Sequence, residues 1–227
     1  MTEVEPLLME IAWEVCNQVG GIYTVLRSKA PSMIDRWGNH YCLVGPYNPK
    51  TAEVEYESAP LVGPVGQAVE QLRQMGYRAH YGRWLVSGRP QAVLLDVQSV
   101  AGALDELKYR VWSDHGISSS DEATVNDAVA FGEMCRALLS VLAQQESPGR
   151  PLVAHFHEWQ AGLAIPMLRK EGWPGSLVFT THATLIGRYL ATGNTGFYDR
   201  LPFVDGDAEA KRFNVQTQHQ IEKAAAH

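Results

Sequence analysis

Two short segments carry most of the side chains that could bind a ligand or take part in a reaction. They hold imidazole, carboxylate, indole and guanidinium groups, at His155, His157, Glu158 and Trp159 in one segment and at His182 and Arg188 in the other. A strand-end histidine can hydrogen-bond a sugar hydroxyl, and an arginine a few residues later can neutralise a diphosphate. The structural alternatives are a histidine that only satisfies local hydrogen bonds and an arginine in a surface salt bridge.

Each of these segments follows a short apolar run that is typical of a buried strand. The runs are 151–154 and 176–179. In an open α/β sheet, ligands bind beyond the carboxyl ends of the strands. We therefore expect both segments to deliver their polar side chains to the same edge of one sheet, and this shared placement favours the functional interpretation.

A pair of glycines, Gly20-Gly21, lies between a predicted strand and a predicted helix. Paired glycines allow the backbone to approach a ligand, and the start of the following helix adds free N–H groups and the positive end of its dipole. Such a loop can hold a phosphate. It lacks the full glycine patterns of dinucleotide sites and P-loops, so a turn that only reverses the chain remains the alternative.

A metal site is a further alternative for the first segment. His155 and His157 are two residues apart, so their side chains share one face of a strand, and Glu158 could be a third ligand. No later cluster of aspartates or histidines completes the ligand set, and we expect no metal and no cofactor.

Composition excludes several classes of protein. The chain has 227 residues, 45% of them hydrophobic and 19% charged, with a net charge of −6 and no run of lysines or arginines. This balance is that of a globular protein, and the lack of a basic stripe argues against a nucleic-acid partner. No signal peptide or membrane span is visible, and the three widely spaced cysteines fit a reducing compartment. We therefore expect a cytoplasmic protein with no membrane association.

Strand-like and helix-like segments alternate along the chain. We expect strands at 7–15, 41–44, 78–86, 91–97, 152–156 and 176–181. We expect helices from just after the paired glycines, then at 68–75, 101–112, 122–145 and 160–170, and a last one from about 208 onward. This alternation predicts an α/β fold with a doubly wound, mostly parallel, Rossmann-like sheet, and the lack of a linker predicts a single domain over 1–227.

The chain resembles the glycogen synthases of the animal and fungal type. The resemblance runs from about residue 10 to the last residue, in order and nearly without gaps. The segments that carry it are 14–26, 43–47, 81–85, 93–97, 126–129, 154–159 and 179–188. Bacterial and plant synthases place a lysine just before the paired glycines, whereas Gln18 and Val19 stand there in this chain, as in the animal and fungal branch.

The resemblance implies one half of a two-domain enzyme of the GT-B type. Those enzymes transfer glucose from UDP-glucose to the 4-hydroxyl at the non-reducing end of an α-1,4-glucan such as glycogen, with retention of configuration. The chain would be the N-terminal, acceptor-side domain, and the C-terminal nucleotide-binding domain would be absent. We therefore expect the isolated chain to be inactive, with UDP-glucose and the glucan as partners of the whole enzyme and a homo-oligomer as a possible assembly.

The resemblance also assigns roles to individual residues. Gly20 and Gly21 would lie against the diphosphate-sugar region of the donor. His182 would contact the donor glucose and Arg188 its phosphates, and these two are the candidate catalytic residues. Glu158 and Trp159 would face the cleft near the acceptor.

Three other functions stay open at this point. The first is a non-catalytic module that binds a glucan or a protein. The second is a metal-dependent hydrolase that uses His155, His157 and Glu158. The third is a nicotinamide dehydrogenase, for which the glycines of 63–68 partly imitate the dinucleotide pattern, but no clear strand precedes them and we expect a loop there.

Overall fold

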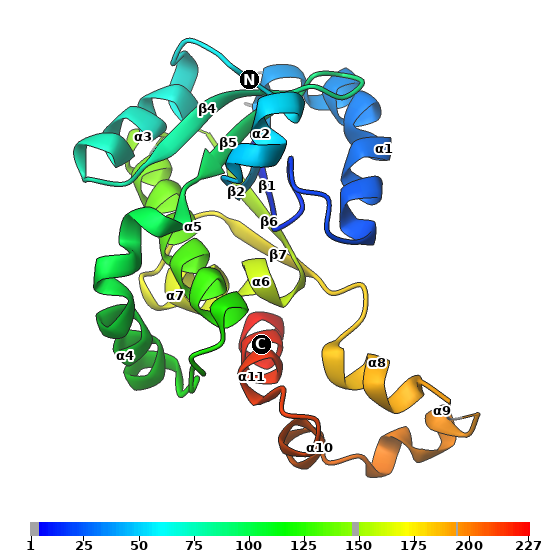
Figure 1. Ribbon diagram of the computed structural model, residues 1–227. Helices are drawn as coiled ribbons and strands as arrows, with labels where there is room; N and C mark the ends of the chain where they lie inside the picture. The colour runs from blue at the N-terminus through cyan, green and yellow to red at the C-terminus, as the bar shows by residue number, and fades with distance from the viewer. Residues whose placement is uncertain (1–4, 147–149, 194) are drawn as a thin grey trace.

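The computed structural model describes residues 5–146, 150–193 and 195–227, and its centre is a seven-stranded sheet (Figure 1). The strand order is β3-β4-β5-β2-β1-β6-β7. The strands are β1 (Leu7–Ala12), β2 (Tyr41–Pro46), β3 (Tyr56–Ser58), β4 (Ala79–Trp84), β5 (Gln91–Leu95), β6 (Leu152–His157) and β7 (Ser176–Thr180). β4 is antiparallel to both of its neighbours, whereas all the other pairs are parallel.

Helices cover both faces of the sheet. On one face lie α1 (Gly21–Trp37) and α2 (Pro49–Glu55). The other face is covered by α3 (Gly63–Gln74), α4 (Leu104–His115), α5 (Ala123–Glu146), α6 (Glu158–Gly162), α7 (Ala164–Lys170) and α11 (Gln216–Ala226). The predicted doubly wound, mostly parallel α/β fold is therefore confirmed.

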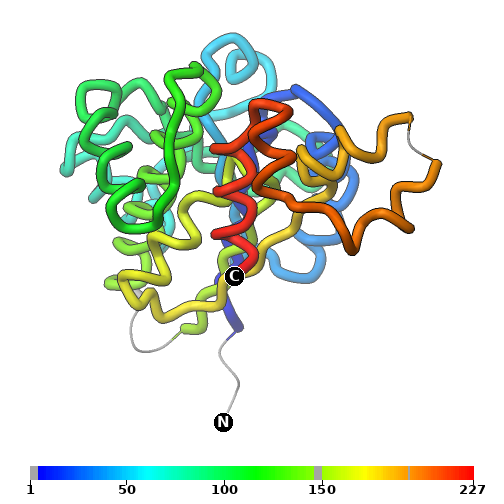
Figure 2. The backbone as a smooth tube through the Cα atoms, turned by 90° about the horizontal axis from the view of Figure 1, so that it is seen from below, coloured from blue at the N-terminus to red at the C-terminus, as the bar shows by residue number. Residues whose placement is uncertain are grey.

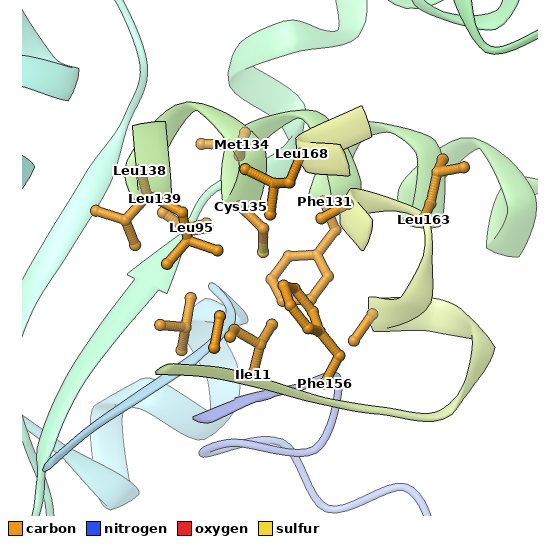
Figure 3. Packing of buried hydrophobic residues seen from close by; sticks show 14 of the residues in the cluster. Ile11, Leu95, Phe131, Met134, Cys135, Leu138, Leu139, Phe156, Leu163 and Leu168 are labelled. Carbon is orange, nitrogen blue, oxygen red and sulfur yellow. The ribbon is translucent and has the colours of Figure 1, made fainter. Parts of the chain in front are cut away.

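Side chains of the central strand β1 alternate between the two faces, as the period of a strand requires. Leu7, Met9 and Ile11 join the larger core beneath α5, where Ile11 lies near Phe156 and Phe131 (Figure 3). Leu8 and Ala12 join the second core, against α1. Glu10 stands between them in the sequence and is 0% exposed, so a carboxylate lies inside this second face of the sheet.

The strand order reverses direction at β1. From β1 the chain passes to β2 on one side, and much later it returns to place β6 on the other side of β1. In open α/β sheets the crevice at such a switch point, outside the carboxyl ends of the strands, is where ligands bind. The loops after β1 and β6 meet at this point, and the loop after β7 lies next to them (Figure 1).

A stretch of short helices extends away from the sheet after β7. It contains α8 (Leu185–Ala191), α9 (Phe197–Arg200) and α10 (Gly206–Arg212), and both views show it projecting from the body (Figures 1 and 2). Ile186, Ala210 and Val215 form a small hydrophobic cluster of their own there. The chain then returns through α11, which packs against α6 and α7.

Most predicted elements are present, with shifted ends. The predicted strand 7–15 ends at Ala12, and the predicted helix 160–170 begins at residue 158 and is divided into α6 and α7. The predicted last helix is two helices, α10 and α11. The elements α2, β3, α8 and α9 were not predicted, because each has at most seven residues and too few positions to show a period.

The expected loop at 63–68 is wrong, because these residues are the first turns of α3. Gly63 has φ +66°, which favours glycine at the start of the helix. A Cβ on Gly66 would lie 2.8 Å from the backbone carbon of Leu61. These glycines are therefore explained by chain packing, and nothing in their setting favours a dinucleotide site.

Within the described part of the chain, none of the helices has both the length and the apolar character that a membrane span requires.

Candidate functional site

A cavity of about 440 Å³ lies at the carboxyl ends of β1, β6 and β7. Seven of its lining residues are among those that the sequence singled out: Gly20, Gly21, His157, Glu158, Trp159, His182 and Arg188. They come from three loops and from the helices that follow them, so segments more than 150 residues apart contribute to one site. The structure thus brings the predicted residues together, while their individual roles stay predictions.

The glycine loop at the start of α1 is held by an acidic side chain. Glu14 Oε2 accepts hydrogen bonds from the backbone N–H groups of Gly20, at 2.7 Å, and of Tyr23, at 2.9 Å. A carboxylate is favourable here because the N-terminus of a helix carries partial positive charge. The N–H groups of Gly21 and Ile22 have no acceptor among the described residues, so they are the ones that remain for a ligand.

The steric setting of the two glycines differs. A Cβ on Gly20 would lie 3.1 Å from Glu14 Oε1, whereas a Cβ on Gly21 would meet nothing within 4 Å. Packing therefore does not require a glycine at position 21, which faces open space in the cavity. A ligand that approaches the backbone closely is one reason to keep a glycine there.

Glu158 connects the loop after β6 to the loop after β7. Its Oε1 accepts hydrogen bonds from the backbone N–H groups of His182, at 2.7 Å, and Ala183, at 3.3 Å. Glu158 itself has φ +61°, a left-handed conformation that is costly for a residue with a side chain. Strained residues of this kind cluster at functional sites, where the surrounding structure holds them in place.

Trp159 contributes much less surface than expected. Its side chain is only 7% exposed and belongs to the main hydrophobic core. The indole therefore anchors the start of α6 in the hydrophobic core, and only a small part of the ring reaches the cavity.

His182 is exposed at the cavity and is connected to the protein interior through a second histidine. Its Nε2 lies 3.2 Å from Nδ1 of His157, and the two rings stack with their centroids 5.5 Å apart. Nε2 of His157 lies 2.7 Å from Oε1 of Glu10. Both inner residues are buried, His157 at 3% exposed and Glu10 at 0%.

Glu10 is surrounded by hydrogen-bond donors. Besides His157, the Lys29 ammonium contacts Oε1 and the Tyr41 hydroxyl donates to Oε2. Burial alone would raise the pKa of Glu10, but the hydrogen bond from His157, the positive charge of Lys29 and the hydrogen bond from Tyr41 outweigh it and lower the pKa to about 2. Glu10 is therefore a permanent buried anion at physiological pH.

This cluster does not fit a metal ion. Among the residues that the structure describes, the groups close enough to share an ion are Glu10, His155 and His157, not the predicted set with Glu158. Lys29 and Tyr41 already occupy both oxygens of Glu10, and Thr180 Oγ1 lies 2.8 Å from His155 Nε2. Burial and the neighbouring His157 lower the pKa of His155 to about 4. A cation would have to displace the Lys29 ammonium, so this group of residues is a hydrogen-bonded network.

Arg188 projects from α8 and lines the same cavity. Its side chain is exposed, and across the ranges that the structure describes no acidic group forms an ion pair with its guanidinium. The surface salt bridge considered from the sequence is therefore not formed with any described residue. The helix that carries Arg188 is capped by Thr184, whose Oγ1 accepts a hydrogen bond from Gly187 N at 3.1 Å.

A buried acid on α11 supports the start of α8. Glu222 is 4% exposed, and its Oε1 accepts a hydrogen bond from the backbone N–H of Leu185 at 3.2 Å. Its other oxygen, Oε2, has no hydrogen-bond partner in the described part of the chain. Burial raises the pKa of Glu222 to about 7, and the nearby Glu158 adds to this, while the Leu185 N–H and Arg188 act against it.

Sequence reasoning missed the acids that organise the site. These residues are Glu10, Glu14 and Glu222. The only signal in the sequence was at Glu10, a single charge inside the apolar run 7–12, because charged residues are almost never fully buried unless they are paired. Glu222 lies in a predicted helix, where acidic residues are common at the surface, and Glu14 lies in the turn after β1, where nothing in the sequence marks it.

Known proteins resemble the chain over nearly its whole length. The family model described as "Glycogen synthase" matches residues 10–227. The glycogen [starch] synthase of Neurospora crassa is 40% identical over 223 residues, which cover 97% of this chain and 31% of that protein. Isoform 2 of the Saccharomyces cerevisiae glycogen [starch] synthase is 42% identical, and the match covers 97% of this chain and 33% of that protein. The Homo sapiens liver glycogen [starch] synthase is 39% identical, and the match covers 98% of this chain and 32% of that protein.

The chain therefore spans about a third of the length of these relatives. The matched region contains every residue of the cavity described above. With a family match over most of the chain and about 40% identity, the chain belongs to the glycogen synthase family.

Proposed function

We propose that this chain forms the N-terminal, acceptor-side domain of a two-domain GT-B glycosyltransferase. The whole enzyme would transfer glucose from UDP-glucose to the 4-hydroxyl at the non-reducing end of an α-1,4-glucan, with retention. The main support is the meeting of Gly21, His182 and Arg188 in one cavity at the switch point of the sheet. Membership of the glycogen synthase family supports the same reaction.

The diphosphate of the donor would lie between Arg188 and the N-terminus of α1. Arg188 is exposed in the cavity without a described ion-pair partner, and the N–H groups of Gly21 and Ile22 are open to an acceptor. As the bond between glucose and the diphosphate breaks, negative charge develops on the leaving group. Fixed cations and N–H dipoles that stabilise this charge lower the barrier.

The glucose of the donor would lie against His182, which offers a ring nitrogen to a sugar hydroxyl. Glu158 commits Oε1 to the loop of His182, and its Oε2 would face the acceptor glucan. Trp159 would contribute only the edge of its ring to the same region. No step of this proposal needs a metal or a cofactor.

A second domain would complete the site. The cavity lies at one edge of the sheet, and closure of a facing domain would exclude the water that otherwise hydrolyses the donor. This chain alone would supply half of the environment of the transition state, so we expect it to be inactive by itself. We also propose a cytoplasmic location, which the free and buried Cys16, Cys42 and Cys135 favour, and possible assembly into homo-oligomers.

The proposal is tested by measuring the incorporation of labelled glucose from UDP-glucose into glycogen. The full-length enzyme, with this chain followed by the second domain, should incorporate label and give an α-configured product, whereas the 227-residue chain should not. Robust incorporation by the chain alone would show that the site is complete without a second domain. Binding of glucan by the full-length protein without transfer would favour a non-catalytic module.

A further inference from the structure

A line of three residues crosses the sheet from its interior to the cavity. It begins at Glu10 in β1, passes through His157 at the end of β6, and ends at His182 in the loop after β7. These three strands are neighbours in the sheet, as Figure 1 shows. Both inner members are buried and only His182 is exposed, so the line connects a fixed buried charge to the surface of the site.

The protonation of the inner members follows from the charges that face them. Glu10 carries one negative charge, and the Lys29 ammonium on the same oxygen balances it. The other groups packed around them are the neutral Tyr41 hydroxyl and the imidazole of His155. A second cation at His157, which is 3% exposed, would be an uncompensated buried charge. In its neutral form, His157 has one nitrogen that donates and one that accepts.

The direction of each hydrogen bond is then fixed. Both oxygens of an ionised carboxylate can only accept, so Nε2 of His157 carries the hydrogen and donates to Glu10. Nδ1 of His157 must then accept, and Nε2 of His182 donates to it. In a neutral imidazole the other nitrogen has no hydrogen. Nδ1 of His182 is thus the nitrogen that remains available to a ligand.

We propose that Glu10 and His157 are positioning residues that hold His182 in the tautomer whose Nδ1 accepts a hydrogen bond from a hydroxyl of the bound sugar. The identity of this ligand rests on the proposed function, whereas the tautomer does not. A nitrogen that can only accept selects a hydroxyl at one position of the sugar and gains nothing from an ether or a hydrogen atom there. Glu10 and His157 would therefore set the specificity of the site for one hydroxyl of the donor glucose.

The first test reads the tautomers without any activity. The side-chain nitrogens of the 227-residue chain, labelled with nitrogen-15 on histidine, distinguish a ring nitrogen that carries hydrogen from one that does not. At about pH 8, we expect Nε2 protonated and Nδ1 bare in both His157 and His182. A doubly protonated His157, or a hydrogen on Nδ1 of either ring, would overturn the proposal whatever reaction the enzyme catalyses.

The second test measures discrimination in the full-length enzyme with UDP-glucose and its monodeoxy analogues. The wild type should prefer UDP-glucose over one particular analogue by roughly tenfold in kcat/KM, because one uncharged hydrogen bond is lost. His182→Ala and His157→Phe should both abolish the preference against that same analogue. His157→Gln, whose amide can still donate to Glu10 and accept from His182, should retain part of it.

The matched control is His155→Gln. His155 lies two residues earlier on β6, also faces Glu10, at 3.5 Å, and packs its ring against that of His157, but among the described residues its ring nitrogens meet Glu10 and Thr180 and form no hydrogen bond with His182. This variant should keep the full discrimination. If His155→Gln lost it to the same extent as His157→Phe, or if His157→Phe kept it, the positioning role would be refuted. If no variant or wild-type preparation transferred glucose, the proposed function would fail while the tautomer measurement would still stand.

Discussion

The carboxylate of Glu158 lies 2.7 Å from the backbone nitrogen of His182 and accepts a hydrogen bond from it. The two residues come from different strand ends, and the next residue in the second loop, Ala183, donates to the same oxygen. Leu185, two residues further on, donates to Glu222. Two acids from two different helices therefore accept hydrogen bonds from three backbone N–H groups, two in the loop that carries His182 and one at the first residue of the helix that carries Arg188.

Glu158 affects stability in two ways, through the hydrogen bonds of its carboxylate and through the strain of its left-handed backbone conformation. Two substitutions separate these effects. Glu158→Ala and Glu158→Gly both remove the carboxylate, but only glycine also relieves the strain of φ +61°. We expect Glu158→Gly to be more stable than Glu158→Ala by about 1 kcal/mol in the free energy of unfolding, measured by urea denaturation. Equal stabilities would mean that the backbone at residue 158 relaxes when the side chain is lost.

Arg188 is expected to act on the reaction step more than on glucan binding. In the full-length enzyme, Arg188→Ala should lower kcat by about 10²–10³-fold, the usual effect of losing one charge-stabilising donor, with little change in KM for glycogen. The control is Arg200→Ala, an exposed arginine of α9 that does not line the cavity, which should keep wild-type kinetics. A loss under tenfold, or one confined to glycogen affinity, would reassign Arg188 as a structural or acceptor-binding residue.

Gly21 provides a test that separates folding from ligand binding. Since a Cβ there meets nothing within 4 Å and residue 21 begins a helix, Gly21→Ala should leave the melting temperature unchanged or slightly raised. It should nevertheless weaken UDP-glucose binding, because the methyl group would occupy the space beside the free N–H groups. The matched control is Gly45→Ala, whose Cβ would lie 2.6 Å from the Cβ of Val15 and which should destabilise the fold. Unchanged donor affinity in Gly21→Ala would argue against a phosphate at this loop.

The fold was largely predictable because its strongest signals are local. The buried strands β1 and β6 are short, mostly apolar runs, and α5 is a long, mostly apolar segment that is buried over most of its length. The order of the strands, in contrast, depends on contacts between distant parts of the chain. The short helix α8 has little periodicity of its own and is fixed by packing against α10 and α11.

The site was predictable only in part, for a related reason. The polar groups at strand ends can be recognised from the sequence, because carboxyl ends of parallel strands meet at one edge. The partners of these groups cannot be recognised in this way. Glu10 is 147 residues away from His157 in the sequence, and only the register of β1 against β6 brings them together. The same holds for Glu222 and Leu185, which the return of α11 places in contact.

Glu222 should make stability depend on pH near neutrality. Its pKa is about 7 in the folded protein and near the ordinary value of 4.5 in the unfolded chain, so the folded state binds more protons between these values. The free energy of unfolding should therefore decrease as pH rises from 4.5 through 7. One pH unit corresponds to about 1.4 kcal/mol, so the loss can reach roughly 3 kcal/mol. Glu10 has the opposite sign, but its effect lies between about pH 2 and 4.5, outside this window.

The contribution of Glu222 is measured as a difference between variants, because other groups also titrate in this range. Glu222→Gln keeps an oxygen that can accept from Leu185 N and cannot ionise. In urea denaturation, this variant should be more stable than the wild type at about pH 8 and close to it at about pH 4.5. Glu106→Gln, an exposed carboxylate of α4, should keep the wild-type dependence. Parallel stability curves of the wild type and Glu222→Gln from pH 4.5 to 8 would show that Glu222 does not titrate near neutrality. The buried acid next to the start of α8 would then be a constant structural support of His182 and Arg188.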